Sequence, residues 1–259
     1  METQSLTARQ FGASAAKYLT STVHSSGADL QRLMDVARRS QATRVLDLGC
    51  GAGHASFALA RGGAKEIVAY DPSPAMLAVV AAEAKSRGHA QIDTSQGLAE
   101  SMAFPDATFD LVVTRYSAHH WLNIRRGVHE AARVLKPGGT FIIVDVISPE
   151  NPLLDTVLQT LEILRDLSHV RNYRESEWRG TLADAAFPEP AAHRWRLAME
   201  FTGWVARIGT SAARIAALRT VFDELPVAAR EYYSVEDTRA GEPGSFAIDA
   251  GWFQVCKAP

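Results

Sequence analysis

From about Arg44 onward, the chain alternates short β-branched apolar segments with alanine-rich stretches of helical character. This alternation is the feature that most constrains the fold, because it is typical of a parallel sheet covered by helices. Segments such as 141–144 are continuously apolar, as expected for strands buried on both faces. Right-handed crossovers therefore predict an α/β fold with a doubly wound sheet. The expected strands are residues 44–49, 66–71, 90–97, 109–117 and 140–148, and the expected helices between them are residues 55–61, 74–87 and 124–135.

The periodicity changes after Ser148. Apolar residues at three- and four-residue spacing predict an amphipathic helix over 154–164, and a further helix is expected over 176–186. Alternating apolar residues predict late strands over 194–201 and 245–256, with a helix over 204–222 between them. The sequence thus predicts a sheet of seven strands, mostly parallel, with helical insertions in the C-terminal half. A region before the first strand, over 9–39, is also expected to be helical.

Composition limits the class of protein. The 259 residues are 47% apolar and carry 27 basic and 29 acidic side chains, which gives a formal net charge of -2. Nucleic-acid binders normally carry a positive excess, so no nucleic-acid partner is expected. The apolar stretches are too short for a transmembrane helix, and the N-terminus lacks a secretory signal pattern. Two cysteines are too few for a disulfide framework or a four-ligand zinc site, so we expect a cytoplasmic protein without a metal.

Residues 45–54 carry the densest chemical signal. An apolar strand leads there into a turn with glycines at alternate positions, and the turn opens a helix. Such glycines let a ligand approach the backbone amides closely. Asp71 ends the next strand, roughly 20 residues after the turn, where an acidic side chain can bind both hydroxyls of a ribose. Asp71 can also cap the helix that follows, but the two features together predict a nucleoside-binding site.

The ligand is not expected to be a dinucleotide. The third glycine of the dinucleotide fingerprint would fall at position 54, which is His54. Asp47, just before the turn, would repel a pyrophosphate but suits a cationic amino-acid group. A nicotinamide-dependent oxidoreductase is therefore the less favoured interpretation.

Taken in order, the motifs resemble those of class I S-adenosylmethionine-dependent methyltransferases. The resemblance rests on residues 45–54 with Asp71, on 97–110 and on 133–140, and it is nearest to the ubiquinone- and menaquinone-biosynthesis methyltransferases. It implies S-adenosylmethionine as cofactor and direct in-line transfer of its methyl group to a small-molecule acceptor. A non-catalytic or regulatory protein that binds the same cofactor is the main alternative.

The resemblance also implies one Rossmann-like methyltransferase domain over residues 1–259, as a monomer or homodimer. Its parts would be an N-terminal helical lid (1–40), a cofactor-binding core (41–148) and an acceptor side with the insertions and the last two strands (149–259).

Carried over position by position, the resemblance assigns a cofactor site. Asp47 would lie near the methionine ammonium, and Asp71 would accept hydrogen bonds from the ribose hydroxyls. Where the family often has Asp, this chain has Leu98, so Ala99 or Glu100 would replace the polar contact to the adenine. The remaining expected cofactor residues are Gly49, Cys50 and Gly51 beside the methionine and ribose, Pro72 and Met76 against the adenine, and Arg115 and Tyr116 beside the methyl-transfer opening.

The resemblance specifies fewer residues for the acceptor side than for the cofactor site. His119 or His120 would act as general base if the acceptor must lose a proton, whereas other acceptors need only positioning against the sulfonium. Tyr18 and His24 fall where related enzymes place a lid. Trp204 and Arg207 share one helical face and, with the polar-aromatic stretch 171–174, are candidates for the acceptor pocket.

Overall fold

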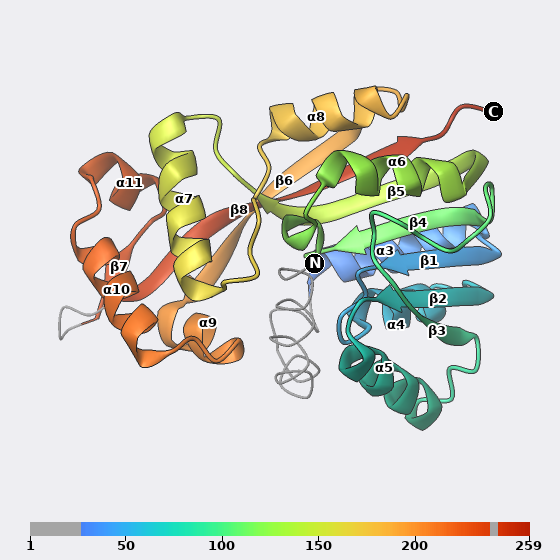
Figure 1. The fold of residues 1–259 in the computed structure, drawn as a ribbon, viewed down its shortest axis with the longest axis horizontal. Helices are drawn as coiled ribbons and strands as arrows, with labels where there is room; N and C mark the ends of the chain where they lie inside the picture. Colours follow the sequence, from blue (N-terminus) through green and yellow to red (C-terminus); the bar gives the residue numbers. More distant parts are fainter. Residues whose placement is uncertain (1–26, 239–242) are drawn as a thin grey trace.

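The computed structural model describes residues 27–238 and 243–259. Within these residues, one eight-stranded sheet has the order β3-β2-β1-β4-β5-β8-β6, with the short β7 paired to β8 (Figure 1). The pairs among β1 to β5 are parallel, whereas β8 runs antiparallel to both β5 and β6. The strands are β1 (Arg44–Leu48), β2 (Glu66–Asp71), β3 (Ile92–Gln96), β4 (Phe109–Arg115), β5 (Leu135–Ile147), β6 (Ala191–Glu200), β7 (Glu236–Asp237) and β8 (Pro243–Cys256).

Helices cover both faces of the sheet. The apolar residues of α3, α4 and α5 form one core with one face of the sheet, and those of α6 and α8 form a second core on the other face. A third core joins α7, α9, α10 and α11 to β6 and β8. The helices are α3 (Ala28–Ser40), α4 (His54–Arg61), α5 (Pro74–Ser86), the 3-10 turn η1 (Ala118–His120), α6 (Ile124–Val134), α7 (Pro152–Arg165), α8 (Glu175–Asp184), α9 (Phe201–Arg207), α10 (Ala212–Asp223) and α11 (Val227–Tyr232).

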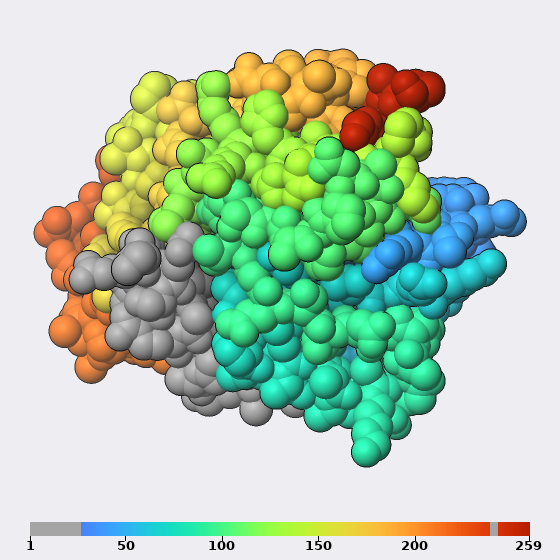
Figure 2. Space-filling model, turned by 45° about the vertical axis from the view of Figure 1, so that its right-hand side comes forward, coloured from blue at the N-terminus to red at the C-terminus, as the bar shows by residue number. Residues whose placement is uncertain are grey.

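The third core forms a separate helical body beside the parallel strands. In Figure 1, β8 and β6 extend from the sheet into this body, which carries α7, α9, α10 and α11. In the surface view of Figure 2, the yellow and orange segments lie at the left and along the top, next to the green segments of the parallel half. The C-terminal half therefore contributes the helical body and also, through α8 and β8, part of the second core on the sheet.

The strand order fixes where a ligand can bind. The chain progresses outward from β1 to β2 and β3, and then returns to place β4 on the opposite side of β1. The carboxyl ends of β1 and β4 thus diverge at a topological switch point, which is where open α/β sheets bind ligands. The segments that follow β1, β2, β3 and β4 all reach this edge.

The predicted fold class is confirmed, including the mostly parallel sheet and the two late strands separated by helices. The interpretation of residues 204–222 as one helix is wrong, because α9 ends at Arg207 and α10 begins at Ala212. Gly209 has a φ of 71° in the linking turn, a left-handed conformation that a helix cannot continue through. The division into lid, core and acceptor side stays a prediction.

Within residues 27–238 and 243–259, none of the helices combines the length and the apolar character needed to cross a bilayer.

Candidate active site

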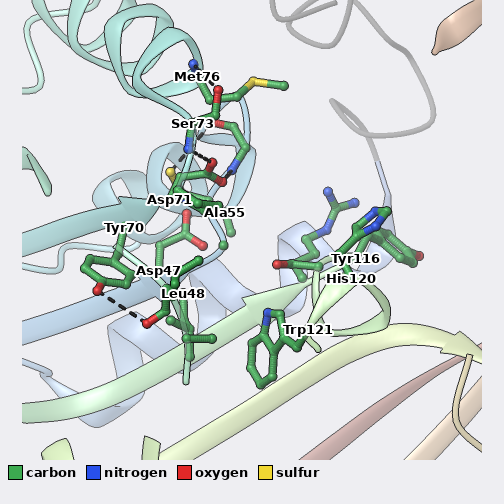
Figure 3. Close-up of a pocket in the computed structure, with 18 of the residues that line it drawn as sticks. Asp47, Leu48, Ala55, Tyr70, Asp71, Ser73, Met76, Tyr116, His120 and Trp121 are labelled. Carbon is green, nitrogen blue, oxygen red and sulfur yellow. Dashed lines mark hydrogen bonds between the residues drawn. The ribbon is translucent and has the colours of Figure 1, made fainter. Parts of the chain in front are cut away.

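A cavity of about 1060 Å³, open to solvent, lies at the carboxyl ends of β1 to β4. We call it the first cavity. Figure 3 shows side chains from the end of β1, the end of β2, the start of α5 and the segment after β4 around it. All eleven expected cofactor residues line it: Asp47, Gly49, Cys50, Gly51, Asp71, Pro72, Met76, Ala99, Glu100, Arg115 and Tyr116.

Asp47 is 1% exposed, at the bottom of the first cavity. Ser56 donates to its Oδ2 from both the backbone N–H at 2.8 Å and the hydroxyl at 2.6 Å. Its Oδ1 is buried and accepts no hydrogen bond from any residue that the structure describes. Burial raises the pKa of Asp47 to about 6. A buried carboxylate oxygen without a donor is destabilising alone and suits a ligand that brings an ammonium group.

Asp71 links the glycine turn to the start of α5. Its Oδ2 accepts from Gly51 N–H and its Oδ1 from Ser73 N–H, each at 2.9 Å. Each carboxylate oxygen can accept a second hydrogen bond, so both can still bind the two hydroxyls of a ribose. Burial raises the pKa of Asp71 to about 6. The interpretation of Asp71 as the helix cap is wrong, because the N-cap of α5 is Ser73, whose hydroxyl accepts from Met76 N–H, and capping therefore does not compete with a ribose role of Asp71.

The glycine turn leaves room for a ligand at one position and requires glycine at another. A Cβ on Gly51 would meet nothing within 4 Å, whereas a Cβ on Gly49 would overlap the Ser117 hydroxyl. Cys50 in the same turn is buried, and its thiol pKa is raised by burial, so it is an inert side chain here rather than a nucleophile. The residues and the open space together fit S-adenosylmethionine.

Arg115 and Tyr116 close the first cavity from the end of β4. Arg115 forms a buried ion pair of 2.5 Å with Asp29 of α3, and its guanidinium lies 4.8 Å from the centroid of the Tyr116 ring. Tyr116 has a φ of 50°, which is rare for a bulky residue and is found where a site over-determines the backbone. Asp29 was not expected at the site, because nothing in a helix surface pattern distinguishes it from a solvated acid.

A second cavity, also open to solvent, adjoins the first and measures about 570 Å³ with the open space included. Tyr116 and His120 line both cavities, so they form the wall between them. Trp204 and Arg207, predicted from one helical face, line the second cavity. The other lining residues come from η1, the end of β5, α7 and the loop after it, β6 and β8: His119, Val146, Glu162, Arg165, Asp166, Asn172, Leu197, Met199 and Ile248.

The two candidate bases take different places. His120 borders both cavities, whereas His119 lines the second cavity but not the first. His119 Nδ1 lies 2.6 Å from Asp145 Oδ1 on β5, and His120 Nδ1 lies 3.1 Å from the carbonyl oxygen of Ser168. Asp145 and Ser168 were not predicted as site residues, and the one signal for Asp145 was its place as an acid inside the apolar 140–147 strand.

Tyr18 and His24 lie outside the described residues. Within 27–238 and 243–259, no three His, Cys, Asp or Glu side chains are grouped so that they could hold a metal ion.

Comparison with known proteins agrees with this geometry. A family model described as a methyltransferase domain matches residues 46–143. The protein named uncharacterized methyltransferase YcgJ of Bacillus subtilis is 35% identical over 247 residues, which cover 95% of this chain and 97% of that protein. The crystal structure of the same relative superposes with a TM-score of 0.83 at 33% identity, covering 88% of this chain and 99% of that chain. A demethylmenaquinone methyltransferase of Chlorobaculum parvum is 31% identical over 111 residues, 43% of this chain and 44% of that protein.

The fold and the first cavity therefore define a class I, Rossmann-like methyltransferase. The chain belongs to the methyltransferase family, with YcgJ as a relative over nearly its whole length, and it is an S-adenosylmethionine-dependent enzyme. The predicted resemblance is confirmed.

Proposed function

We propose that this enzyme binds S-adenosylmethionine in the first cavity and transfers its methyl group to a small organic acceptor held in the second cavity. The observation that carries the proposal is the shared wall: Tyr116 and His120 line both cavities. A methyl group passing between two bound molecules must cross such a boundary. The sulfonium cofactor supplies the electrophilic methyl, and the chain contributes orientation and exclusion of water.

Cofactor binding is supported by complementary charges and hydrogen-bonding capacity. The donor-free Oδ1 of Asp47 would receive the methionine ammonium, and the two oxygens of Asp71 would receive the ribose hydroxyls. Met76, 1% exposed, offers an apolar surface to the adenine. Leu98 lines the adenine end without an acid, and Glu100 accepts there from Asn123 N–H on one oxygen at 3.3 Å. Because a carboxylate has further acceptor sites, Glu100 and the backbone of Ala99 are both candidates for the polar contact to the adenine.

The second cavity suits a small acceptor because it combines both kinds of surface. Val146, Leu197, Met199 and Ile248 are apolar, while the histidines and the residues of α7 are polar or charged. The relatives named for demethylmenaquinone cover between 43% and 54% of this chain, so they support methylation of a small molecule but not a quinone in particular. The near-neutral net charge supports a small molecule over a nucleic acid.

Isothermal titration of S-adenosylhomocysteine tests the cofactor half of the proposal. The wild-type protein is expected to bind, and Asp71→Ala is expected to weaken binding about 10- to 100-fold, since hydrogen bonds to charged groups contribute about 1.5–3 kcal/mol each. Asp93→Ala is the matched control, because Asp93 is an exposed carboxylate on the neighbouring strand β3.

Two results would contradict this assignment. Folded wild-type protein that does not bind S-adenosylhomocysteine at high micromolar concentration would refute cofactor binding in the first cavity. Equal affinity of Asp71→Ala and wild type would remove the ribose role from Asp71 while leaving the rest of the site standing.

A further inference from the structure

Three histidine rings and two carboxylates gather where the second cavity meets η1. The ring centroids of His119 and His120 are 4.2 Å apart, and those of His119 and His169 are 5.8 Å apart. Asp145 and Asp166 approach this group from β5 and from the loop after α7, and both are 2% exposed. The hydrogen bonds around these rings differ, and they assign different chemistry to each histidine.

His119 is held by a single carboxylate. Asp145 accepts the His119 backbone N–H on Oδ2 at 3.2 Å and faces the ring Nδ1 with Oδ1 at 2.6 Å. Because a carboxylate can only accept, Nδ1 carries the proton, and Nε2 is the nitrogen left with a lone pair. Burial lowers the pKa of His119, but Asp145, together with Glu162 and Asp166, outweighs this and raises it above the ordinary value. This is the environment of a proton acceptor.

His120 is placed for a different role. Its Nδ1 lies 3.1 Å from the Ser168 carbonyl oxygen, which also can only accept, so the same tautomer is fixed. Burial and the neighbouring His119 lower the pKa of His120, although Asp166 opposes them. Its Nε2 is 3.9 Å from Asp166 Oδ2. The pKa of the third ring, His169, is lowered in the same way, by burial and by both neighbouring histidines. Among these rings, therefore, only His119 has its protonated form stabilised.

Two residues that line the second cavity also carry buried side-chain N–H groups for which the described residues provide no acceptor. Asn172 and Trp204 are each 1% exposed and line this cavity, and both Asn172 Nδ2 and Trp204 Nε1 are without a hydrogen-bond partner among the described residues. The Asn172 backbone N–H, by contrast, is bonded to Gln159 Oε1 at 3.0 Å, so the surrounding loop is ordered by its own contacts. Two unpaired buried donors are costly unless a ligand oxygen accepts from them.

We propose that the second cavity is built for a protic acceptor, one whose nucleophilic group carries an O–H, with His119 as its general base and Asp145 as the residue that positions His119. The inference rests on the proposed function. The acceptor O–H proton passes to His119 Nε2, and Asn172 and Trp204 donate to the oxygen that gains charge. An electron pair of the acceptor then forms the bond to the methyl carbon, and the methyl–sulfur bond breaks with its electrons remaining on sulfur.

The test uses 4-nitrophenol as the probe, because its anion absorbs visible light and its neutral form does not. The probe is titrated onto protein saturated with S-adenosylhomocysteine, at a pH where the free probe is mainly neutral. We expect the bound probe to be ionised about tenfold more than the free probe, the effect of one pKa unit. 4-Nitroanisole, which has the same ring and no exchangeable proton, should bind without any such change.

Variants separate the roles of the residues. In His119→Gln and Asp145→Asn, the probe is expected to bind with its ionisation reduced to the level in solution. Trp204→Phe and Asn172→Leu should instead weaken binding of the anion about fivefold or more, because each variant loses one hydrogen bond. His129→Gln is the control, because His129 is exposed on α6. Binding of S-adenosylhomocysteine is measured on every sample.

The outcomes distinguish this inference from the proposed function. If the wild-type protein does not bind S-adenosylhomocysteine, the proposed function itself is refuted. If the wild-type protein binds S-adenosylhomocysteine normally, three results overturn only the present inference. The probe binds in its neutral form, it fails to bind, or it ionises equally in wild type and His119→Gln.

Discussion

The first and second cavities share a wall but are assembled in opposite ways. In the first cavity, the two buried carboxylates accept from residues at most 20 positions away, Asp47 from Ser56 and Asp71 from Gly51 and Ser73, whereas the ion pair of Arg115 with Asp29 joins a distant segment. In the second, the histidine contacts span 26 positions, from His119 of η1 to Asp145 of β5, and 48 positions, from His120 to Ser168 in the loop after α7. The carboxylates of the first cavity therefore belong to a local motif, while the second cavity forms only when the helical insertions have packed against the sheet.

This difference explains why motifs shared by the family predicted the ligand of the first cavity, whereas no such motif predicted the ligand of the second cavity. A strand, a glycine turn and an acid at the end of the next strand bind the same cofactor whatever the acceptor is. The helices that build the second cavity come from the insertions. Their apolar periodicity predicts helices, but it does not indicate the chemistry of the side chains. Substitutions on the two sides should therefore have separable effects.

The largest effect is expected from Gly49→Ala. Gly49 has a φ of 76°, and an added Cβ would overlap the Ser117 hydroxyl between β1 and η1. Gly138→Ala is a close control, because Gly138 has a φ of 75° but an added Cβ meets nothing within 4 Å. Both variants lose about 1–2 kcal/mol to the left-handed backbone. Gly49→Ala should lose about 1–3 kcal/mol more through overpacking, together with cofactor affinity.

Urea unfolding and titration of S-adenosylhomocysteine measure the two effects. Equal loss of stability in both glycine variants, with cofactor affinity retained, would show that the turn after β1 tolerates a side chain and that its glycine is not required by the site.

A smaller effect on the affinity for S-adenosylhomocysteine is expected from a change of pH. Because burial raises the pKa of Asp47 to about 6, this carboxyl is mainly protonated in the ligand-free protein below that pH, and a cationic ligand must displace the proton. Affinity for S-adenosylhomocysteine should therefore fall about tenfold per pH unit below pH 6 for each carboxyl that must ionise. Asp47→Asn should flatten part of this dependence. A pH-independent affinity between 5 and 7 would show that neither Asp47 nor Asp71 ionises on binding.

The raised pKa values of Asp47 and Asp71 also affect the stability of the ligand-free protein, which is expected to fall as the pH rises. Between an ordinary aspartate pKa of about 4 and the folded value of about 6, the folded protein binds more protons than the unfolded chain, so the ligand-free protein loses stability as pH rises through this window. Cofactor binding should cancel this loss, because it stabilises the ionised carboxylates.

The smallest effect is expected from Arg207→Ala. Arg207 lines the second cavity and not the first, so the affinity for S-adenosylhomocysteine should stay within about twofold of wild type, an energy difference below about 0.5 kcal/mol. A tenfold loss of cofactor affinity would mean that the two cavities are coupled and that their separation into cofactor and acceptor sides is too simple.

Much of the fold could be predicted from the sequence, and the exceptions are instructive. The strand over 66–71 matches β2 at both ends, since a β-branched run bounded by polar residues leaves little choice of register. The helix over 204–222 could not be predicted as two, because Gly209 acts as a break only when its left-handed φ is selected by the packing of α9 and α10.

The site divides in the same way. Each expected cofactor residue lines the first cavity, because the glycine turn and the end of β2 are adjacent in any sheet with this strand order. Asp145 and Ser168 were not predicted, whereas Asn172 belongs to the stretch 171–174 that was a candidate for the acceptor pocket, and it lines the second cavity. A lone acid in a strand and a polar loop are common features, and only their approach to His119 and His120 gives them a chemical meaning.

The sequence by itself determined the order of strands and helices and the cofactor turn, because both depend on contacts between near neighbours and on backbone conformations that few residues allow. Only the tertiary structure decided which carboxylate lies within hydrogen-bond distance of His119, which buried N–H groups lack a described acceptor, and that a second cavity adjoins the first. Those properties depend on desolvation and on distances between elements far apart in the chain, which arise when the helical half packs against the sheet.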